Sequence, residues 1–174
     1  MDNPLQEILL KPIGMIHCSR NQAIDDYWGD VVSVIELDSK QFTEESILGL
    51  EQFSHIEVLF YMNLVEMEKI EKKARHPRDN TQWPRVGIFA QRAKGRPNCL
   101  GVSRCRLLKI NGLTLTVLAL DAIDKTPVLD IKPYIREYGP SGQTYQPSWA
   151  SELMTNYYSE KPSNSKTTIH DYNL

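Results

Sequence analysis

The feature that most constrains the fold of this 174-residue chain is a pair of predicted strands of matching length, joined by Asn111-Gly112. The first segment reads SRCRLLKI and the second reads LTLTVLAL. An Asn-Gly dipeptide suits the two left-handed positions of a type I′ turn, which joins neighbouring antiparallel strands. The second segment alternates leucine or valine with threonine, so one of its faces is expected to be buried. The sequence therefore predicts a β-hairpin near the middle of the chain.

Other segments extend this pattern into a mainly β fold. Further strands are predicted at 9–17, VVSVIELD, HIEVLFYM, VGIFA and PVLDIKPY. Helices are predicted at TEESILGLEQF and PSWASELMTNYY, and residues 67–80 are expected to form a loop or a short helix. Six or seven short strands without alternating helices are typical of an antiparallel barrel rather than a parallel sheet. We expect a small, closed or partly open antiparallel β-barrel with a few short helices. Residues 1–160 are predicted to form a single domain and 161–174 a polar tail.

Composition and missing motifs exclude several classes of protein. Three cysteines without CxxC spacing fit a reducing cytoplasm, and neither a membrane span nor a secretory signal is evident in the sequence. Its four histidines lack metal-ligand spacing, so no metal is expected. A Rossmann glycine motif, a P-loop and a GxSxG elbow are absent. Ser54 and His55 are adjacent on a predicted strand, so their side chains are expected on opposite faces and not as a catalytic pair.

Positive charge is concentrated in one region of a slightly acidic chain. The net charge is −2, yet residues 72–109 contain eleven Lys or Arg and a single acid, Asp79. Such a split indicates an anionic partner such as nucleic acid. The alternative is that these side chains pair with acids elsewhere in the fold.

Two short motifs have the residue types of a ligand site. In RPNCLG, Pro97 restricts the backbone and Gly101 permits close approach, with Arg92 and Arg96 as candidate anion ligands. A solvated tight turn explains the same residues equally well. In LDAIDKTPVLDIKPY, the carboxylates of Asp121 and Asp124 could cap turns, bind ribose hydroxyls or accept a proton.

Taken together, the motifs resemble the TrmO family, also called TsaA-like or YaeB-like. PIGMIHCSRNQ, GLEQFSHIEVLF, GIFAQRAKGRPNCLGVSRCRLLKI and LDAIDKTPVLDIKPY follow one another in the family's order, across roughly residues 12–134. The resemblance implies a homodimeric β-barrel that uses S-adenosylmethionine as methyl donor. Its substrate class is tRNA, methylated at N6 of threonylcarbamoyladenosine at position 37.

The family's functional residues carry over where the motifs match. The resemblance implies donor binding by Arg92, by the segment Leu120, Asp121, Ala122 and Ile123, and by Asn63 and Leu64, where typical members have His-Gln. The residue chemistry, rather than the resemblance, makes Asp121 or Asp124 the candidate proton acceptor, although either could equally hold the cofactor. The basic stretch likewise suggests Arg75, Arg78 and Arg96 as tRNA contacts.

Three departures from the family pattern keep other functions open. RNQAIDDYWGDVV occupies the place of the family's PRQ segment, Lys125 replaces a glycine in the DGTP motif, and a short predicted helix near Trp149–Tyr158 stands where longer members have a C-terminal domain. The alternatives are a methyltransferase that uses the same donor on another RNA or a small molecule, and a non-catalytic module that binds S-adenosylmethionine.

Overall fold

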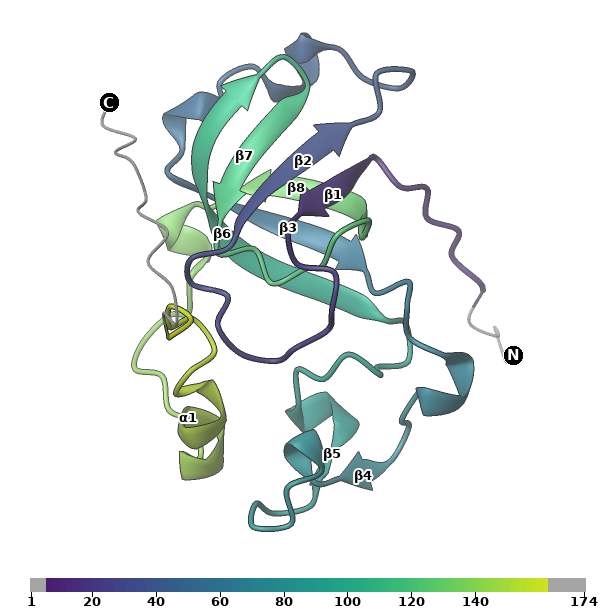
Figure 1. Ribbon diagram of the computed structural model, residues 1–174, viewed down its shortest axis with the longest axis vertical. Coiled ribbons are helices and arrows are strands. Elements are labelled where there is room, and N and C mark those ends of the chain that lie inside the picture. Colours follow the sequence, from purple (N-terminus) through teal and green to yellow (C-terminus); the bar gives the residue numbers. More distant parts are fainter. Residues whose placement is uncertain (1–5, 163–174) are drawn as a thin grey trace.

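The computed structural model describes residues 6–162, and its centre is a closed antiparallel β-barrel (Figure 1). Around the barrel the strands follow the order β1-β2-β7-β6-β3-β8. Their bounds are β1 Gly14–Cys18, β2 Val32–Leu37, β3 His55–Tyr61, β6 Leu100–Asn111, β7 Thr114–Leu118 and β8 Pro127–Pro133. Pairing of β8 with β1 closes the barrel. The prediction of a mainly β barrel is confirmed, and the barrel is closed.

Alternating side chains explain why these strands form a barrel. In β6, Gly101, Ser103 and Cys105 point inward and are buried, whereas Val102 and Arg104 point outward. Each strand places every second side chain in the interior, where apolar residues from all six strands form one core. The fully buried members are Ile16, Ile35, Ile56, Val58, Leu115, Val117, Leu120 and Val128.

The central hairpin forms, but its turn lies one residue later than the sequence predicts. Asn111 still pairs with Thr114, so the two turn residues are Gly112 and Leu113. Gly112 alone has a positive φ, of 56°, which fits a type II′ turn rather than type I′. Pairing of β7 with β2 fixes which β7 side chains face the core, and a bulge in β6 between Leu107 and Lys109 absorbs the offset.

Helices are shorter than the sequence predicts. TEESILGLEQF forms two 3-10 helices, η1 Glu44–Ile47 and η2 Leu50–Gln52, because Gly49 takes a left-handed conformation with φ 86° between them. Near the C-terminus α1 spans Ser148–Met154 and is followed by turns through residue 158. The first strand likewise begins only at Gly14, after an extended segment from residue 6.

A long excursion between β3 and β6 lies outside the barrel. It contains η3 Met67–Lys69, β4 Ala74–Arg75, η4 Pro77–Asp79, β5 Val86–Gly87 and η5 Ile88–Ala90. Strands β4 and β5 pair as a separate two-stranded sheet. The predicted strand VGIFA is therefore only two residues of strand followed by a 3-10 turn. In Figure 1 the excursion and α1 lie below the barrel, opposite the β6–β7 turn.

The predicted polar tail begins at residue 161 and lies outside the described residues from 163 onward. That residues 1–160 act as one domain stays a prediction.

Candidate functional site

The connection from β7 to β8 carries the four predicted donor-binding residues 120–123. It crosses the end of the barrel opposite the β6–β7 turn and is tied at both ends to the loop between β1 and β2. Ala119 N donates to Val31 O at 2.9 Å, and Asp124 N donates to Arg20 O at 2.8 Å. Leu120 and Ala122 are 0% and 3% exposed and belong to the core. Because their side chains are buried, Leu120 and Ala122 can contact a ligand only through their backbone atoms. Asp121 can also contact it through its carboxylate.

Asp121 is a buried carboxylate with one satisfied and one unsatisfied oxygen. Tyr157 Oη donates to Asp121 Oδ2 at 2.7 Å, and the Asp121 backbone N–H points at Ser103 Oγ at 3.4 Å. Asp121 Oδ1 is buried and has no hydrogen-bond partner among the described residues. Burial raises the pKa of Asp121, although Ser103, Tyr157 and the positive charge of Arg92 act to lower it. Buried polar atoms without partners are rare, and each calls for an explanation such as a catalytic role or a bound water.

The structure brings Arg92 into the same region as Asp121. Its guanidinium is exposed and donates to the carbonyl oxygen of Val102 at 2.6 Å, on the strand that carries Ser103. Its charge also acts on Tyr158, whose pKa is raised to about 12, first by burial and then by the Asp121 carboxylate. Arg92, Ser103, Asp121, Tyr157 and Tyr158 therefore form one cluster, which we call the Asp121 cluster.

Asp124, the second predicted proton acceptor, lies in a different network. Its Oδ1 accepts the Cys18 backbone N–H at 3.1 Å and lies 3.9 Å from His17 Nδ1. His17 also contacts Glu36 on the neighbouring strand, at 3.3 Å. This carboxylate thus fixes the end of β1 against the β7–β8 connection, a common role for an aspartate at a turn.

The other predicted donor residues, Asn63 and Leu64, follow β3 at the start of the excursion. Both are exposed, and the Asn63 backbone N–H bonds to Tyr61 O at 2.9 Å in a local turn. No hydrogen bond between described residues joins either of them to the Asp121 cluster.

Two of the predicted tRNA-binding arginines, Arg78 and Arg96, make ion pairs or hydrogen bonds within the fold. Arg78 makes a two-pronged ion pair with Asp26, at 2.8 and 3.1 Å. Arg96 donates to the backbone carbonyls of Ile88 and Gln91, which holds the RPN loop against η5. Arg75 is half-buried in β4, and its Nε atom has no partner in the described part of the chain. Several charges of the basic stretch are thus engaged within the fold, as the alternative reading of that stretch anticipated.

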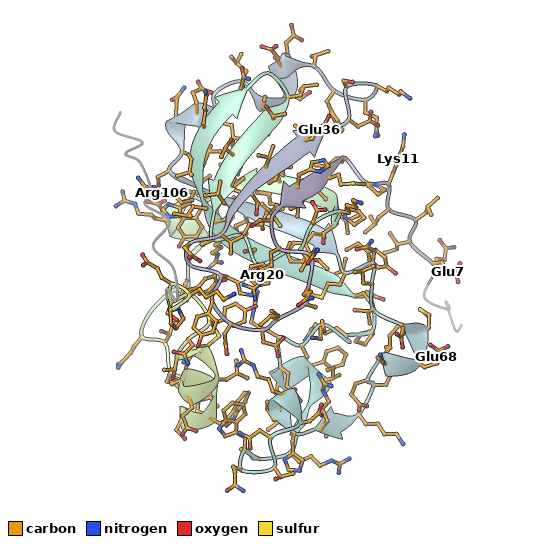
Figure 2. The ribbon with its side chains drawn as sticks, in the orientation of Figure 1. Glu7, Lys11, Arg20, Glu36, Glu68 and Arg106 are labelled. Carbon is orange, nitrogen blue, oxygen red and sulfur yellow. The ribbon has the colours of Figure 1, made fainter. Side chains whose placement is uncertain are left out.

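Arg20 organises the loop that stands in place of the family's PRQ segment (Figure 2). Its guanidinium lies 3.6 Å from the centre of the Trp28 ring and donates to the carbonyl oxygens of Ile24, Asp26 and Tyr27. Trp28 is 4% exposed, and its Nε1 is a second buried polar atom without a partner among residues 6–162. The loop lies beside the Asp121 cluster, since Trp28 N also donates to Tyr157 O at 2.8 Å.

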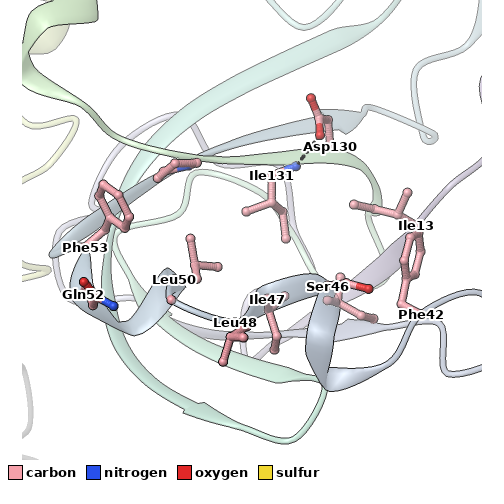
Figure 3. Close-up of a pocket in the computed structure, with 13 residues that line it drawn as sticks. Ile13, Phe42, Ser46, Ile47, Leu48, Leu50, Gln52, Phe53, Asp130 and Ile131 are labelled. Atoms are coloured by element: carbon pink, nitrogen blue, oxygen red, sulfur yellow. Dashed lines mark hydrogen bonds between the residues drawn. The ribbon is translucent and has the colours of Figure 1, made fainter.

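A pocket lies at the other end of the barrel (Figure 3). It has a volume of about 620 Å³ and lies between η1, η2 and β8, lined mainly by isoleucine, leucine and phenylalanine. Asp130 is the charged residue in its lining, and its Oδ1 accepts the Ile131 backbone N–H at 2.9 Å. None of the predicted donor-binding or proton-accepting residues lines this pocket.

Ser54 and His55 lie near this end, and the expectation that their side chains diverge is wrong. Ser54 Oγ lies 2.9 Å from His55 Nδ1, because Ser54 precedes β3 and is not bound by the alternation of the strand. The pair is exposed.

Comparison with known proteins places the fold in a family. The family model described as the tRNA-methyltransferase O N-terminal domain matches residues 25–139. This chain belongs to that family. The resemblance seen in the sequence motifs is confirmed.

Individual relatives agree with this assignment. A human tRNA (adenine(37)-N6)-methyltransferase is 36% identical over 131 residues, which are 74% of this chain but 29% of the human protein. A probable S-adenosyl-L-methionine-binding protein of Methanothermobacter thermautotrophicus is 34% identical, with 78% of this chain and 96% of that protein covered. The crystal structure of TrmO from Pseudomonas aeruginosa aligns with a TM-score of 0.64 at 28% identity, covering 80% of this chain and 62% of that one.

Three cluster members, Ser103, Tyr157 and Tyr158, were missed by reasoning from sequence. Ser103 could have been found as the one hydroxyl on the inward, otherwise apolar face of β6. Tyr157 carries no such signal, because its contact with Asp121 spans 36 residues of sequence and depends on how the chain folds back after α1.

Within residues 6–162 no group of three or more His, Cys, Asp or Glu side chains is arranged to hold a metal ion. Nor does that part of the chain contain a helix with the length and apolar character needed to cross a membrane.

Proposed function

We propose that this chain is an S-adenosylmethionine-dependent methyltransferase that methylates N6 of threonylcarbamoyladenosine at position 37 of tRNA. The carrying observation is the Asp121 cluster, on the segment that the family resemblance assigns to donor binding. Its buried, unpartnered Oδ1 and the nearby Arg92 offer an acceptor and a positive charge. A ligand with N–H or O–H donors and a carboxylate, as S-adenosylmethionine has, suits this pair.

The proposed reaction requires that the methyl donor and the acceptor nitrogen are aligned and that one proton is removed from that nitrogen. S-adenosylmethionine supplies an activated methyl group on a sulfonium, so neither an enzyme nucleophile nor a metal is needed. The acceptor nitrogen gains the methyl group, the sulfur keeps the electron pair of the broken bond, and a base takes the N6 proton. Asp121 and Asp124 are the two candidates for this base. If Asp121 Oδ1 binds the donor, as proposed above, both oxygens of Asp121 are engaged, and the N6 proton passes to Asp124. Placing the two substrates at reacting distance contributes on the order of 7–11 kcal/mol.

For tRNA, we propose that the exposed lysines of the excursion make the phosphate contacts rather than Arg78 and Arg96. Lys72 and Lys73 are exposed, and the described residues offer them no ion pair. Arg78 and Lys94, by contrast, are paired with Asp26 and Asp25. Arg75 keeps its place as a proposed contact, since its Nε is unsatisfied.

We also propose a cytoplasmic homodimer. All three cysteines are free, which suits a reducing compartment. Tyr61, Leu100 and Val102 are each 38% exposed, and with Leu59 they form an apolar patch on the outer face of β3 and β6. A symmetric dimer would bury this patch against its own copy. Light scattering that gives a 20.0 kDa particle at micromolar concentration would count against the dimer.

A second candidate, a module that binds S-adenosylmethionine without transferring its methyl group, has one observation in its favour. The M. thermautotrophicus relative, named only as a probable binding protein, is matched over 96% of its length, whereas the human methyltransferase is matched over 29%. This chain thus spans less than a third of the longer relative, and the remainder of that protein could be needed for its activity.

Donor binding and methyl transfer are tested separately. A hundredfold excess of S-adenosylhomocysteine over its Kd should stabilise the chain by about 2.7 kcal/mol, and Arg92→Ala should remove the resulting shift in Tm. Arg85→Ala is the matched control, because Arg85 is also exposed and also bonds to a backbone carbonyl. Mass spectrometry of tRNA nucleosides from cells with and without the chain then decides between the two candidates. Donor binding with unchanged tRNA nucleosides would favour the binding module.

A further inference from the structure

The segment after α1 lies against the Asp121 cluster and supplies two aromatic side chains to it. We call residues 155–160 the C-terminal strap. Tyr157 Oη bonds to Asp121 Oδ2, and the rings of Tyr157 and Tyr158 meet edge to face with centres 5.0 Å apart. None of the three family-level assignments, to residues 63–64, 92 and 120–123, includes this strap.

Backbone contacts fix the strap to the β1–β2 loop. Tyr27 N donates to Asn156 O at 2.9 Å, and Trp28 N donates to Tyr157 O at 2.8 Å. At the next residue, Gly29, an added Cβ would lie 2.0 Å from Tyr158 O, so the two backbones touch there and only glycine fits. The strap is therefore docked by its main chain, and Tyr157 enters the cluster from a fixed position.

As a consequence, one carboxylate oxygen of Asp121 is hydrogen-bonded to Tyr157 and the other has no partner among the described residues. Because Tyr157 occupies Oδ2, the orientation of the carboxylate is set, and the buried Oδ1 is the oxygen left for a ligand's hydrogen-bond donor. Deprived of the tyrosine hydroxyl, the carboxylate could rotate and would lose one of the bonds that favour its ionised form.

We propose that Tyr157 is a positioning residue, which holds the Asp121 carboxylate in the orientation that binds the nucleoside donor. The proposal rests on the function proposed above and extends it to a residue from the C-terminal strap. Tyr158 borders the same site, with 44% of its surface exposed.

The charged and titratable groups that face Asp121 come from every element packed around it. Burial raises the pKa of Asp121, whereas the nearby hydroxyls of Ser103 and Tyr157 and the positive charge of Arg92 lower it. Cys105 and Tyr158 are neutral near pH 7, because the pKa of each is raised to about 12. Since the hydroxyl of Tyr157 stabilises the carboxylate, its removal should raise the pKa of Asp121, and donor binding should fail at a higher pH on acidification.

The experiment measures S-adenosylhomocysteine binding by calorimetry from pH 5 to pH 8 for the full chain and three variants. Tyr157→Phe should weaken binding about tenfold, the usual effect of losing one hydrogen bond to a charged group, and should move the acid loss of binding to higher pH. Gly29→Ala should act in the same direction by displacing the strap. Tyr138→Phe, at a tyrosine that is 82% exposed, is the control and should match the wild type.

The outcomes separate this inference from the proposed function. If the wild type binds and Tyr157→Phe keeps both its Kd and its pH midpoint, Tyr157 does not position Asp121. Tighter binding by Tyr157→Phe would also overturn the inference, because Tyr157 would then block the site. If the wild type itself does not bind, the proposed function fails and the inference fails with it.

Discussion

The two ends of the barrel are built on different principles. At the end with the β6–β7 turn, the left-handed positions are glycines, Gly49 and Gly112, and the neighbouring side chains are apolar. At the other end, Ala119 and Lys125 bracket the β7–β8 connection with φ of 64° and 62°, although neither is glycine. The buried polar atoms of Trp28 and Asp121 that have no partner among residues 6–162 lie there as well.

The difference indicates that the end of the barrel with Asp121 contains features that lower the stability of the fold, which is typical of a functional site. Left-handed non-glycine residues and unsatisfied buried polar atoms each cost on the order of 1–3 kcal/mol, and they persist only where the surrounding structure enforces them. Here the enforcement comes from hydrogen bonds between the β7–β8 connection and the β1–β2 loop. We therefore expect substitutions at the turn end to affect folding and substitutions at the Asp121 end to affect binding.

The largest expected effect is at the turn end, at Leu115. This side chain is fully buried, and Leu115→Ala should lower the free energy of unfolding by about 2–5 kcal/mol through the cavity that it leaves. Urea unfolding gives the change. S-adenosylhomocysteine should still bind to the fraction that remains folded, and a loss of binding without loss of stability would contradict the division between the ends.

A smaller effect with the opposite sign is expected for Asp121→Asn. Burial raises the pKa of Asp121 in the folded state above its ordinary value of 3.8, so the protein is most stable when this group is protonated. That stability is fully present below the unfolded pKa and is lost as pH rises through the folded pKa. Asparagine does not ionise, so the variant should be more stable than the wild type by about 1 kcal/mol or more at pH 8.

The measurement for Asp121→Asn is the difference in Tm between variant and wild type at pH 4, 6 and 8. We expect the difference to grow with pH while donor binding is lost. A difference that stays constant with pH would mean that the Asp121 carboxylate carries no cost in the folded protein.

The smallest effect is expected at Lys125, where the family motif has glycine. The left-handed backbone costs a side chain roughly 1–2 kcal/mol, partly offset by the greater freedom of glycine in the unfolded chain. Lys125→Gly should therefore stabilise by about 0.5–1 kcal/mol. The matched variant Gly112→Ala, at φ 56°, should destabilise by a similar amount. Thermal unfolding of both checks the pair, and stabilisation by Gly112→Ala would show that the two ends do not differ in backbone strain.

The sequence by itself determined the class of fold and the family. Strand alternation, the Asn111-Gly112 hairpin and the order of four motifs are local features, which can be recognised in a single sequence. They sufficed to predict a small antiparallel barrel and to select Arg92 and Asp121. The exact turn was not predictable, because pairing with β2 and a bulge in β6 decided its register.

Only the tertiary structure decided which charged residues are free and which are engaged. Arg78 looks like a nucleic-acid contact in the sequence, but it meets Asp26 from 52 residues away. Asp121 and Asp124 look equivalent, yet one is buried against Tyr157 and the other caps β1. The physical reason is that the pKa and the availability of a charged group depend on burial and on partners brought together by folding. The candidate site therefore includes Tyr157, a residue that no motif marks.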